Sequence, residues 1–285
     1  MIEDIVPAII AALNEDIGTG DITTGATISH NVFGKGIFLV KDDGIIAGVD
    51  VAEQVFKTVD QGLAFLKSRK DGEMVKNGDI AAIVEGSAAS ILTAERTALN
   101  FMQRMSGIAT MAFQFRDKVK HTNAKIIDTR KTVPGLRIID KLAVRIGGCE
   151  NHRRGLYDMF LIKDNHIAVA GSVTKAVKAC REFRDLKSMN FLIEVETTNL
   201  LEVTEALHSG VDIIMLDNFE LVEMVKAVSL IKGKCKVEAS GGINLYTVKD
   251  IAETGVDFIS VGALTHSVKA LDISLEVQLS RTHAR

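Results

Sequence analysis

The chain of 285 residues carries 34 Lys and Arg against 37 Asp and Glu, and 47% of its residues are hydrophobic. This composition is ordinary for a globular protein with a large buried core, and a net charge of −3 argues against nucleic acid or a membrane surface as a partner. No apolar run approaches the length of about 18 residues that a membrane-spanning helix needs.

The chain has three cysteines, Cys149, Cys180 and Cys235, which form no Cys-x-x-Cys pair. Widely spaced cysteines in an odd number are typical of free thiols in a reducing compartment, and they argue against a cysteine metal site. The acidic amino terminus lacks the basic start of a secretion signal. We therefore expect a cytoplasmic protein.

In chain order, residues 2–13 carry apolar side chains at helical spacing and predict an amphipathic helix. The Gly- and Thr-rich residues 16–24 predict a turn, because their glycines match no phosphate-loop pattern. Between 32 and 91, short β-type runs alternate with turn signals, which predicts a small sheet domain. Residues 92–119 then predict a helix.

Six short apolar runs between 125 and 264 each end in a polar, charged or glycine residue. Helix-like segments separate the later runs, so the pattern predicts parallel β/α units. In a barrel of such units the carboxyl ends of the strands meet at one rim, where catalytic residues lie. The residues that end the runs are Arg130, Lys163, Glu196, Asp217, Ser240 and Gly262.

The last apolar stretch, at 271–279, alternates strictly and predicts a half-buried strand. We expect this strand to rejoin the amino-terminal sheet, because a parallel barrel has no place for it.

Basic residues gather between 128 and 166, where eight Lys and Arg stand against five Asp and Glu. Arginine suits a planar carboxylate, which it can hold with two parallel hydrogen bonds, and lysine supplies a point charge for phosphate. Four of these residues lie beside turns or strand ends and are expected at a binding site: Arg130, Lys131, Arg153 and Lys163. We interpret three others as solvated surface charges: Arg137, Lys141 and Arg154. His152 alone is typical of a structural, hydrogen-bonding histidine.

Glu196 and Asp217 end consecutive strands and are expected to lie near each other on the rim. Two carboxylates there suit a hydrated Mg²⁺ ion or the hydroxyls of a sugar. Glu194 shares the strand face of Glu196 and is expected to support it. The alternative is a buried ion pair between Glu196 and Lys163.

Small residues end the last two strands, at 240–242 and 262–263, and a helix-like segment begins near 247. Backbone amides at such turns form the recurring phosphate pocket of β/α barrels. Together with the acidic pair and the basic cluster, they predict a phosphorylated, metal-bound sugar beside a carboxylated partner.

As a set, these motifs resemble the quinolinate phosphoribosyltransferase family. The resemblance covers nearly the whole chain and is densest at 93–100, 128–137, 151–153, 163–166 and 240–243. It implies an α/β fold of two domains. The first is an amino-terminal α/β sandwich over 1–112, joined by a carboxyl-terminal strand over 270–285. The second, over 113–269, is an incomplete, seven-stranded α/β barrel of the type II phosphoribosyltransferase kind.

The family's activity transfers phosphoribosyl from phosphoribosyl pyrophosphate to quinolinate with decarboxylation, for NAD biosynthesis, and uses Mg²⁺. The resemblance implies that a first group of residues binds the pyridine dicarboxylate: Arg130, His152, Arg153 and Lys163. It implies that a second group contacts phosphoribosyl pyrophosphate: Lys131, Glu196 and Asp217. The last two would reach the metal only through substrate or water. The 5′-phosphate would lie against Ser240, Gly241, Gly242, Gly262 and Ala263.

The resemblance further places Thr129 among the substrate-binding residues and gives catalytic roles to Lys131, Lys163, Glu196 and Asp217. It implies a homodimer, or a multiple of dimers, in which Arg96 reaches the partner subunit's site. Cys149 stands where the family commonly carries a glycine. An exposed thiol there would make the enzyme sensitive to alkylation.

Three other functions fit parts of the pattern. One is the pyrophosphorylase-like protein found with molybdate transporters, or a transferase for another carboxylated base. The second is a non-catalytic phosphate-sensing barrel, which would need neither Glu196 nor Asp217. The third is an aldolase-type barrel with a Schiff base at Lys163, which would give the arginine cluster no role. The intact motifs at 151–153 and 163–166 favour quinolinate.

Overall fold

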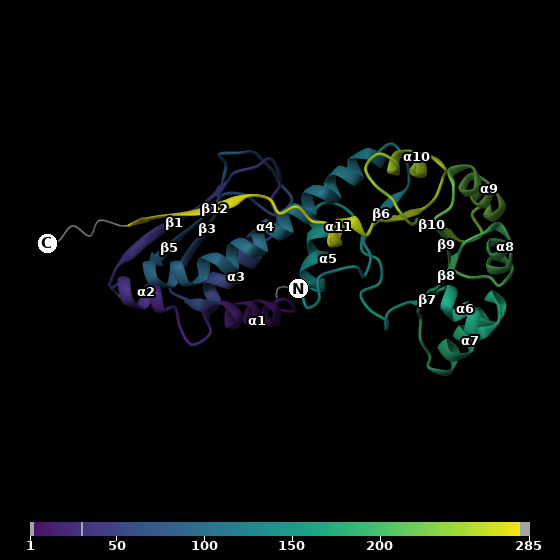
Figure 1. The fold of residues 1–285 in the computed structure, drawn as a ribbon, viewed down its shortest axis with the longest axis horizontal. Coiled ribbons are helices and arrows are strands. Elements are labelled where there is room, and N and C mark those ends of the chain that lie inside the picture. The colour runs from purple at the N-terminus through teal and green to yellow at the C-terminus, as the bar shows by residue number, and fades with distance from the viewer. Residues whose placement is uncertain (1–2, 30, 280–285) are drawn as a thin grey trace. The chain divides into compact units, whose positions relative to one another are not determined.

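The computed structural model describes residues 3–29 and 31–279. The chain divides into two compact units (Figure 1). The first comprises Met1–Phe113, Thr132–Gly148 and Ser267–Arg285, and the second comprises Gln114–Lys131 and Cys149–His266. The helix α5, Arg137–Ile146, therefore belongs to the first unit, although the sequence placed it within the barrel domain.

The sheet of the first unit is antiparallel and has the strand order β12-β1-β5-β3. Its members are β12 (Ile273–Leu279), β1 (Phe33–Val40), β5 (Ile80–Ser87) and β3 (Ala64–Lys67). β12 pairs with β1 along its whole length. The carboxyl-terminal strand thus rejoins the amino-terminal sheet, as its alternating pattern predicts. The part of the expected strand at 280–285 lies outside the described residues.

Four helices of the first unit precede the barrel: α1 (Val6–Ile17), α2 (Ile22–Thr27), α3 (Val49–Val59) and α4 (Ala88–Val119). A two-stranded sheet of β2 (Gly44–Ile45) and β4 (Met74–Val75) completes the unit. α2 begins within the stretch that we expected to be a turn, because the Asp21 carboxylate accepts a hydrogen bond from Thr24 N at 2.9 Å and caps the helix.

Lys141 on α5 corrects one expectation. We interpreted this residue as a solvated surface charge, but its side chain is only 3% exposed. It follows Asp140 on the buried face of α5, where the Asp140 carboxylate accepts two hydrogen bonds from the Arg104 guanidinium at 2.8 and 2.7 Å. A basic residue at this position belongs to a charged interior, which its own sequence context does not reveal.

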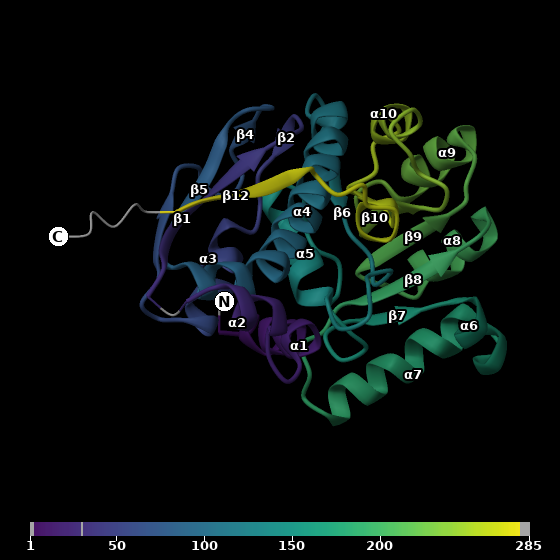
Figure 2. The same ribbon diagram turned by 60° about the vertical axis from the view of Figure 1, so that its left-hand side comes forward.

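The second unit is built on six parallel strands in the order β6-β11-β10-β9-β8-β7 (Figure 2). They are β6 (Lys125–Ile127), β11 (Phe258–Ser260), β10 (Lys236–Ser240), β9 (Ile213–Asp217), β8 (Ile193–Thr197) and β7 (Phe160–Ile162). A parallel bridge from Ile127 to Glu150 adds a seventh strand position beside β6. Within the described part of the chain, no ladder joins this position to β7, so the barrel is incomplete.

Helices follow the strands and cover the barrel: α6 (Asp164–Ala170), α7 (Val173–Leu186), α8 (Leu200–His208), α9 (Leu221–Ile231), α10 (Val248–Glu253) and α11 (Ala263–His266). α8, for example, packs on β8 and β9. The first four residues of β9 are buried, as expected for a parallel strand covered on both sides. No helix among the described residues is both long and apolar enough to cross a bilayer.

Candidate active site

A cavity of about 570 Å³ opens at the carboxyl ends of the barrel strands, and we call it the rim cavity. Parallel strands bring their last residues to one edge, so side chains far apart in sequence meet there. Every site residue suggested by the sequence lines this cavity except Arg96, Gly262 and Ala263. The lining residues of that set are Thr129, Arg130, Lys131, His152, Arg153, Lys163, Glu196, Asp217, Ser240, Gly241 and Gly242.

The three remaining residues lie elsewhere. Arg96 is exposed on α4 in the first unit. Gly262 and Ala263 lie after β11 and are not part of the cavity lining. A Cβ atom on Gly262 would lie 3.1 Å from Lys131 Cδ, so the glycine makes room for the Lys131 side chain. Thr265 Oγ1 donates a hydrogen bond of 2.8 Å to Lys131 O and fixes the same residue from the other side.

Five residues of the cavity lining were not expected from the sequence: Leu161, Met215, Asn218, Glu238 and Ser260. Glu238 is the most informative of them. It lies two residues before Ser240 on β10, and alternate strand residues share a face. A charged residue inside an apolar run, on the face of a predicted site residue, was the signal that could have found it.

Lys163 Nζ and Glu196 Oε2 form an ion pair on the cavity wall. The pairing that we considered as an alternative therefore exists, but it is not buried, because the Lys163 side chain is 45% exposed. An exposed ion pair contributes little to the free energy of folding. The Lys163 ammonium can therefore leave the Glu196 carboxylate and bind a ligand anion at small cost.

The turn after β10 requires glycine at position 241. Asn218 Nδ2 donates a hydrogen bond of 2.8 Å to Asp217 Oδ2. Gly241 has φ +97°, and a Cβ atom there would lie 2.2 Å from Asn218 Oδ1. The glycine thus lets Asn218 hold the Asp217 carboxylate and leaves the backbone of the turn open to the cavity.

Asp128 organises the basic side of the cavity. Its buried carboxylate accepts hydrogen bonds from His152 N and from Asn151 Nδ2, both at 2.8 Å. These bonds fix the loop that carries Arg153, whose Nη1 donates to Met159 O at 3.2 Å. Burial, and then the positive charge of Arg130, lower the pKa of Arg153. Both guanidinium groups line the same cavity, so their repulsion favours an anionic ligand.

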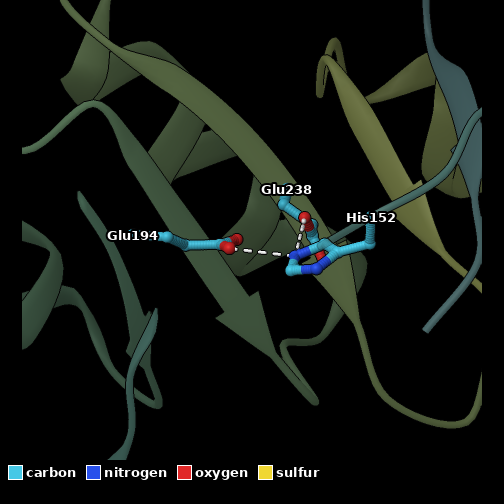
Figure 3. A group of neighbouring side chains, drawn as sticks. All are labelled: His152, Glu194 and Glu238. Carbon is cyan, nitrogen blue, oxygen red and sulfur yellow. Dashed lines mark hydrogen bonds and ion pairs between the residues drawn. The ribbon is translucent and has the colours of Figure 1, made fainter. Parts of the chain in front are cut away.

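His152 sits at the centre of a buried cluster with Glu194 and Glu238 (Figure 3). Its Nε2 atom lies 3.0 Å from Glu194 Oε2 and 3.6 Å from Glu238 Oε2. Its Nδ1 atom accepts a hydrogen bond of 2.8 Å from Arg153 N, so the ring proton is on Nε2 and points at the carboxyl groups. A metal ion in this cluster would need the lone pair of Nε2. The cluster is therefore a hydrogen-bond network, and the structural role expected for His152 is present.

Burial shifts both glutamates of this cluster. It raises the pKa of Glu194 to about 7. Burial, and then the negative charge of Glu194, raise the pKa of Glu238 well above its usual range. Such pKa shifts are common at functional sites, where side chains in an unusual protonation state take part in catalysis.

Cys149 overturns the expectation of an exposed thiol. The residue is 6% exposed, and burial raises the pKa of its thiol to about 12. The thiolate, which is the reactive form, is therefore scarce at neutral pH.

We expect iodoacetamide to leave Cys149 unmodified and activity intact. Cys180 and Cys235, which are only partly buried, should react first. Mass spectrometry of tryptic peptides, taken alongside activity at each time point, measures both quantities. Loss of activity that follows labelling of Cys149 would contradict the buried environment.

Comparison with known proteins places this geometry in context. The family model described as the N-terminal domain of quinolinate phosphoribosyl transferase matches residues 21–106, and the model of the C-terminal domain matches residues 108–276. The chloroplastic nicotinate-nucleotide pyrophosphorylase [carboxylating] of Arabidopsis thaliana is 49% identical, over 96% of this chain and 83% of its own.

Two bacterial proteins are similar over almost their full length. The probable nicotinate-nucleotide pyrophosphorylase [carboxylating] of Bacillus subtilis (strain 168) is 43% identical, over 93% of this chain and 91% of its own. The solved structure of the nicotinate-nucleotide pyrophosphorylase from Francisella tularensis superposes with a TM-score of 0.89 at 42% identity, covering 95% of this chain and 94% of that one.

Proposed function

Because the chain belongs to the quinolinate phosphoribosyl transferase family, we propose that it transfers phosphoribosyl from phosphoribosyl pyrophosphate to quinolinate. The products are nicotinate mononucleotide, pyrophosphate and CO₂, and the enzyme is a glycosyltransferase of NAD biosynthesis. The observation that carries the proposal is one cavity that joins a pair of neighbouring guanidinium groups to carboxylates and a glycine turn.

The pyridine dicarboxylate fits the basic side of the rim cavity. Arg130 and Arg153 each offer a planar fork that can hold one carboxylate, and Lys163 adds a third positive charge. The presence of two arginines in one cavity supports a ligand with two acidic groups, because a single carboxylate would leave part of their repulsion uncompensated. His152 lies beneath them and keeps the Arg153 backbone in place through its Nδ1 atom.

The phosphoribosyl group fits the opposite side. The turn at Ser240, Gly241 and Gly242 presents backbone to the cavity, and Lys131 supplies a point charge for phosphate. Asp217 and Glu196 can orient the ribose hydroxyls. The residues also fit a Mg²⁺ ion, because Asp217 and Glu196 offer oxygen atoms that could bind its water shell. When bound to the pyrophosphate, the ion would neutralise charge on the leaving group.

The chain's contribution to the transfer is placement and electrostatics. Lys131 and Lys163 stabilise the departing pyrophosphate, while Asp217 and Glu196 face the positive charge that builds on the ribose. The basic side holds the pyridine nitrogen toward C1 of the ribose, and the new N–C bond makes the ring a pyridinium. The positive nitrogen then stabilises the electron pair that stays on the adjacent ring carbon when the C–C bond breaks, so CO₂ leaves and a proton takes its place on that carbon.

A direct assay tests the function. We expect pyrophosphate and CO₂ to appear in equal amounts when the protein is mixed with quinolinate, phosphoribosyl pyrophosphate and Mg²⁺. Nicotinate in place of quinolinate serves as the control and should release little pyrophosphate. Binding without turnover would favour the phosphate-sensing barrel. A lysine adduct trapped by borohydride in the presence of a carbonyl substrate would favour the aldolase type.

We also propose a homodimer, or a multiple of dimers, in which Arg96 of one subunit completes the partner's site. Arg96 is exposed on α4 and does not line the rim cavity of its own chain. An exposed arginine within a conventional helix is otherwise only a solvated charge.

Mixing two inactive variants tests this role. Arg96→Ala and Arg130→Ala each lack one part of the site, but a mixed dimer recovers one complete site if Arg96 acts across the interface. After unfolding and refolding together, equal amounts should regain about a quarter of the wild-type activity, since random pairing in a twofold dimer makes half the dimers mixed. No recovery, with dimers confirmed by light scattering, would place Arg96 outside the partner's site.

A cytoplasmic location is part of the proposal. Three free cysteines support a reducing compartment, in which thiols persist.

A further inference from the structure

Glu194 and Glu238 form an unusual pair inside the barrel. Glu194 lies on β8 and Glu238 on β10, and their side chains are 0% and 1% exposed. One oxygen of each, Oε1, has no hydrogen-bond partner among the residues that the structure describes. Unpaired oxygens on two buried carboxyl groups are costly if both groups are ionised.

The contacts around His152 show how the buried charge of these three side chains is reduced. Because Nδ1 of His152 accepts from Arg153 N, the imidazole is neutral and has one ring proton, which it directs at Glu194. Both carboxyl groups approach the same Nε2 atom, and their oxygens lie within 4.8 Å of each other. Two buried carboxylates this close repel each other strongly, so one of them carries a proton.

The surroundings place that proton on Glu238. Glu194 receives the closer contact with His152 and feels the positive charges of Arg153 and Lys163. Glu238 faces the negative charge of Glu194, with the His152 ring 3.6 Å away and the hydroxyl of Ser260 beside it. The pair is therefore a carboxylate at Glu194 and a neutral carboxylic acid at Glu238.

Only one member of the pair has access to a ligand. Glu238 lines the rim cavity, whereas Glu194 does not. The other acidic side chains of the lining, Glu196 and Asp217, have polar partners in Lys163 and Asn218. Glu238 is thus a protonated acid on the wall of a site that binds anions.

The proposed reaction needs such a group at one step. When CO₂ leaves, the C–C bond breaks and its electron pair stays on the ring carbon next to the pyridinium nitrogen. That carbon must take up a proton as CO₂ departs, because otherwise the electron pair attacks CO₂ again and re-forms the C–C bond. We propose that Glu238 is the general acid that donates this proton. The inference rests on the proposed function and adds a catalytic residue to it.

The step balances in charge and atoms. The Glu238 O–H bond breaks, its proton forms the new C–H bond with the electron pair, and Glu238 is left as a carboxylate. Solvent returns a proton to Glu238 through the rim cavity once the product has left. The neighbouring charge of Glu194 drives this return, because two ionised carboxylates repel at such close range.

A single-turnover experiment on Glu238→Gln tests the proposal. Glutamine keeps the shape and can still donate to Glu194, but it has no acidic proton. We expect pyrophosphate release close to the wild-type rate, while CO₂ release falls on the order of 10²-fold and the dicarboxylated nucleotide accumulates. Glu238→Asp keeps an acid in the pair and should recover part of the CO₂ release. Glu182→Gln, the same change at an exposed glutamate on α7, is the matched control, in which both products should still appear together at the wild-type rate.

The outcomes separate the possible failures. Equal loss of both products in Glu238→Gln would mean that the residue only positions the site, and CO₂ release that keeps pace with pyrophosphate would assign the proton to another donor. Either result overturns the proposal but leaves the proposed function intact. The proposed function fails only if the wild-type protein releases no pyrophosphate. Should Glu238→Gln not fold, the wild-type enzyme in D₂O is the second test. CO₂ release must slow more than pyrophosphate release there, and an equal effect overturns the proposal.

Discussion

Replacing Arg153 with alanine is expected to raise the Michaelis constant for quinolinate roughly 10- to 150-fold, because a hydrogen bond to a charged group contributes about 1.5–3 kcal/mol. Arg153 lines the rim cavity beside Arg130, and its loop is fixed by Asp128 and His152. The Michaelis constant for phosphoribosyl pyrophosphate should change little, since that substrate fits the side of the rim cavity opposite the arginines. Initial rates with each substrate varied in turn measure both constants.

Arg154 offers a matched control. It is the neighbouring residue and has the same side chain, but it is exposed and does not line the cavity. Arg154→Ala should leave the quinolinate constant near the wild-type value, whereas Arg130→Ala should raise it as Arg153→Ala does. An unchanged Michaelis constant for quinolinate in both Arg130→Ala and Arg153→Ala would show that these arginines do not bind the dicarboxylate.

The second large effect is expected at Gly241. An alanine there must adopt φ +97° and would place its Cβ 2.2 Å from Asn218 Oδ1. Strain of this kind costs about 1–3 kcal/mol, and relief of the clash moves Asn218 away from Asp217. We expect the specificity constant for phosphoribosyl pyrophosphate to fall roughly tenfold or more, with a lower unfolding midpoint.

The adjacent glycine, Gly242, distinguishes the effect of backbone strain from the effect of the steric contact with Asn218. Gly242 also has a positive φ, +61°, but a Cβ atom there meets no atom within 4 Å. Gly242→Ala should therefore show only the modest cost of the left-handed backbone, roughly 1–2 kcal/mol, and keep Asn218 in place. Thermal unfolding and initial rates of the two variants provide the comparison. Equal effects would mean that the contact with Asn218 is unimportant.

Strand-end residues were predictable because the period of the β/α unit fixes where each strand stops. Six residues were expected at one rim from that spacing, and five of them line one cavity: Arg130, Lys163, Glu196, Asp217 and Ser240. Gly262, the sixth, is not part of the lining. The final strand was predictable for a related reason, since its strict alternation suits an antiparallel sheet and not a parallel barrel.

Other features depend on packing that no local pattern encodes. Cys149 and Lys141 are both buried, although each has a charged residue beside it in the sequence. Glu238 was overlooked because a single glutamate in an apolar run looks like part of a strand, and only its approach to Glu194 and His152 gives it meaning. The role of Arg96 came from family resemblance alone, since a helix-surface arginine carries no signal of its own.

Calorimetric titration of the protein with quinolinate and with nicotinate tests the central claim most directly. The claim is that neighbouring basic groups hold two acidic groups of one pyridine ring. We expect quinolinate to bind at least roughly tenfold more tightly, because nicotinate leaves one charged contact unmade. The preference should disappear in Arg153→Ala. Equal affinities of the wild-type protein for the two acids, or tighter binding of nicotinate, would contradict the account.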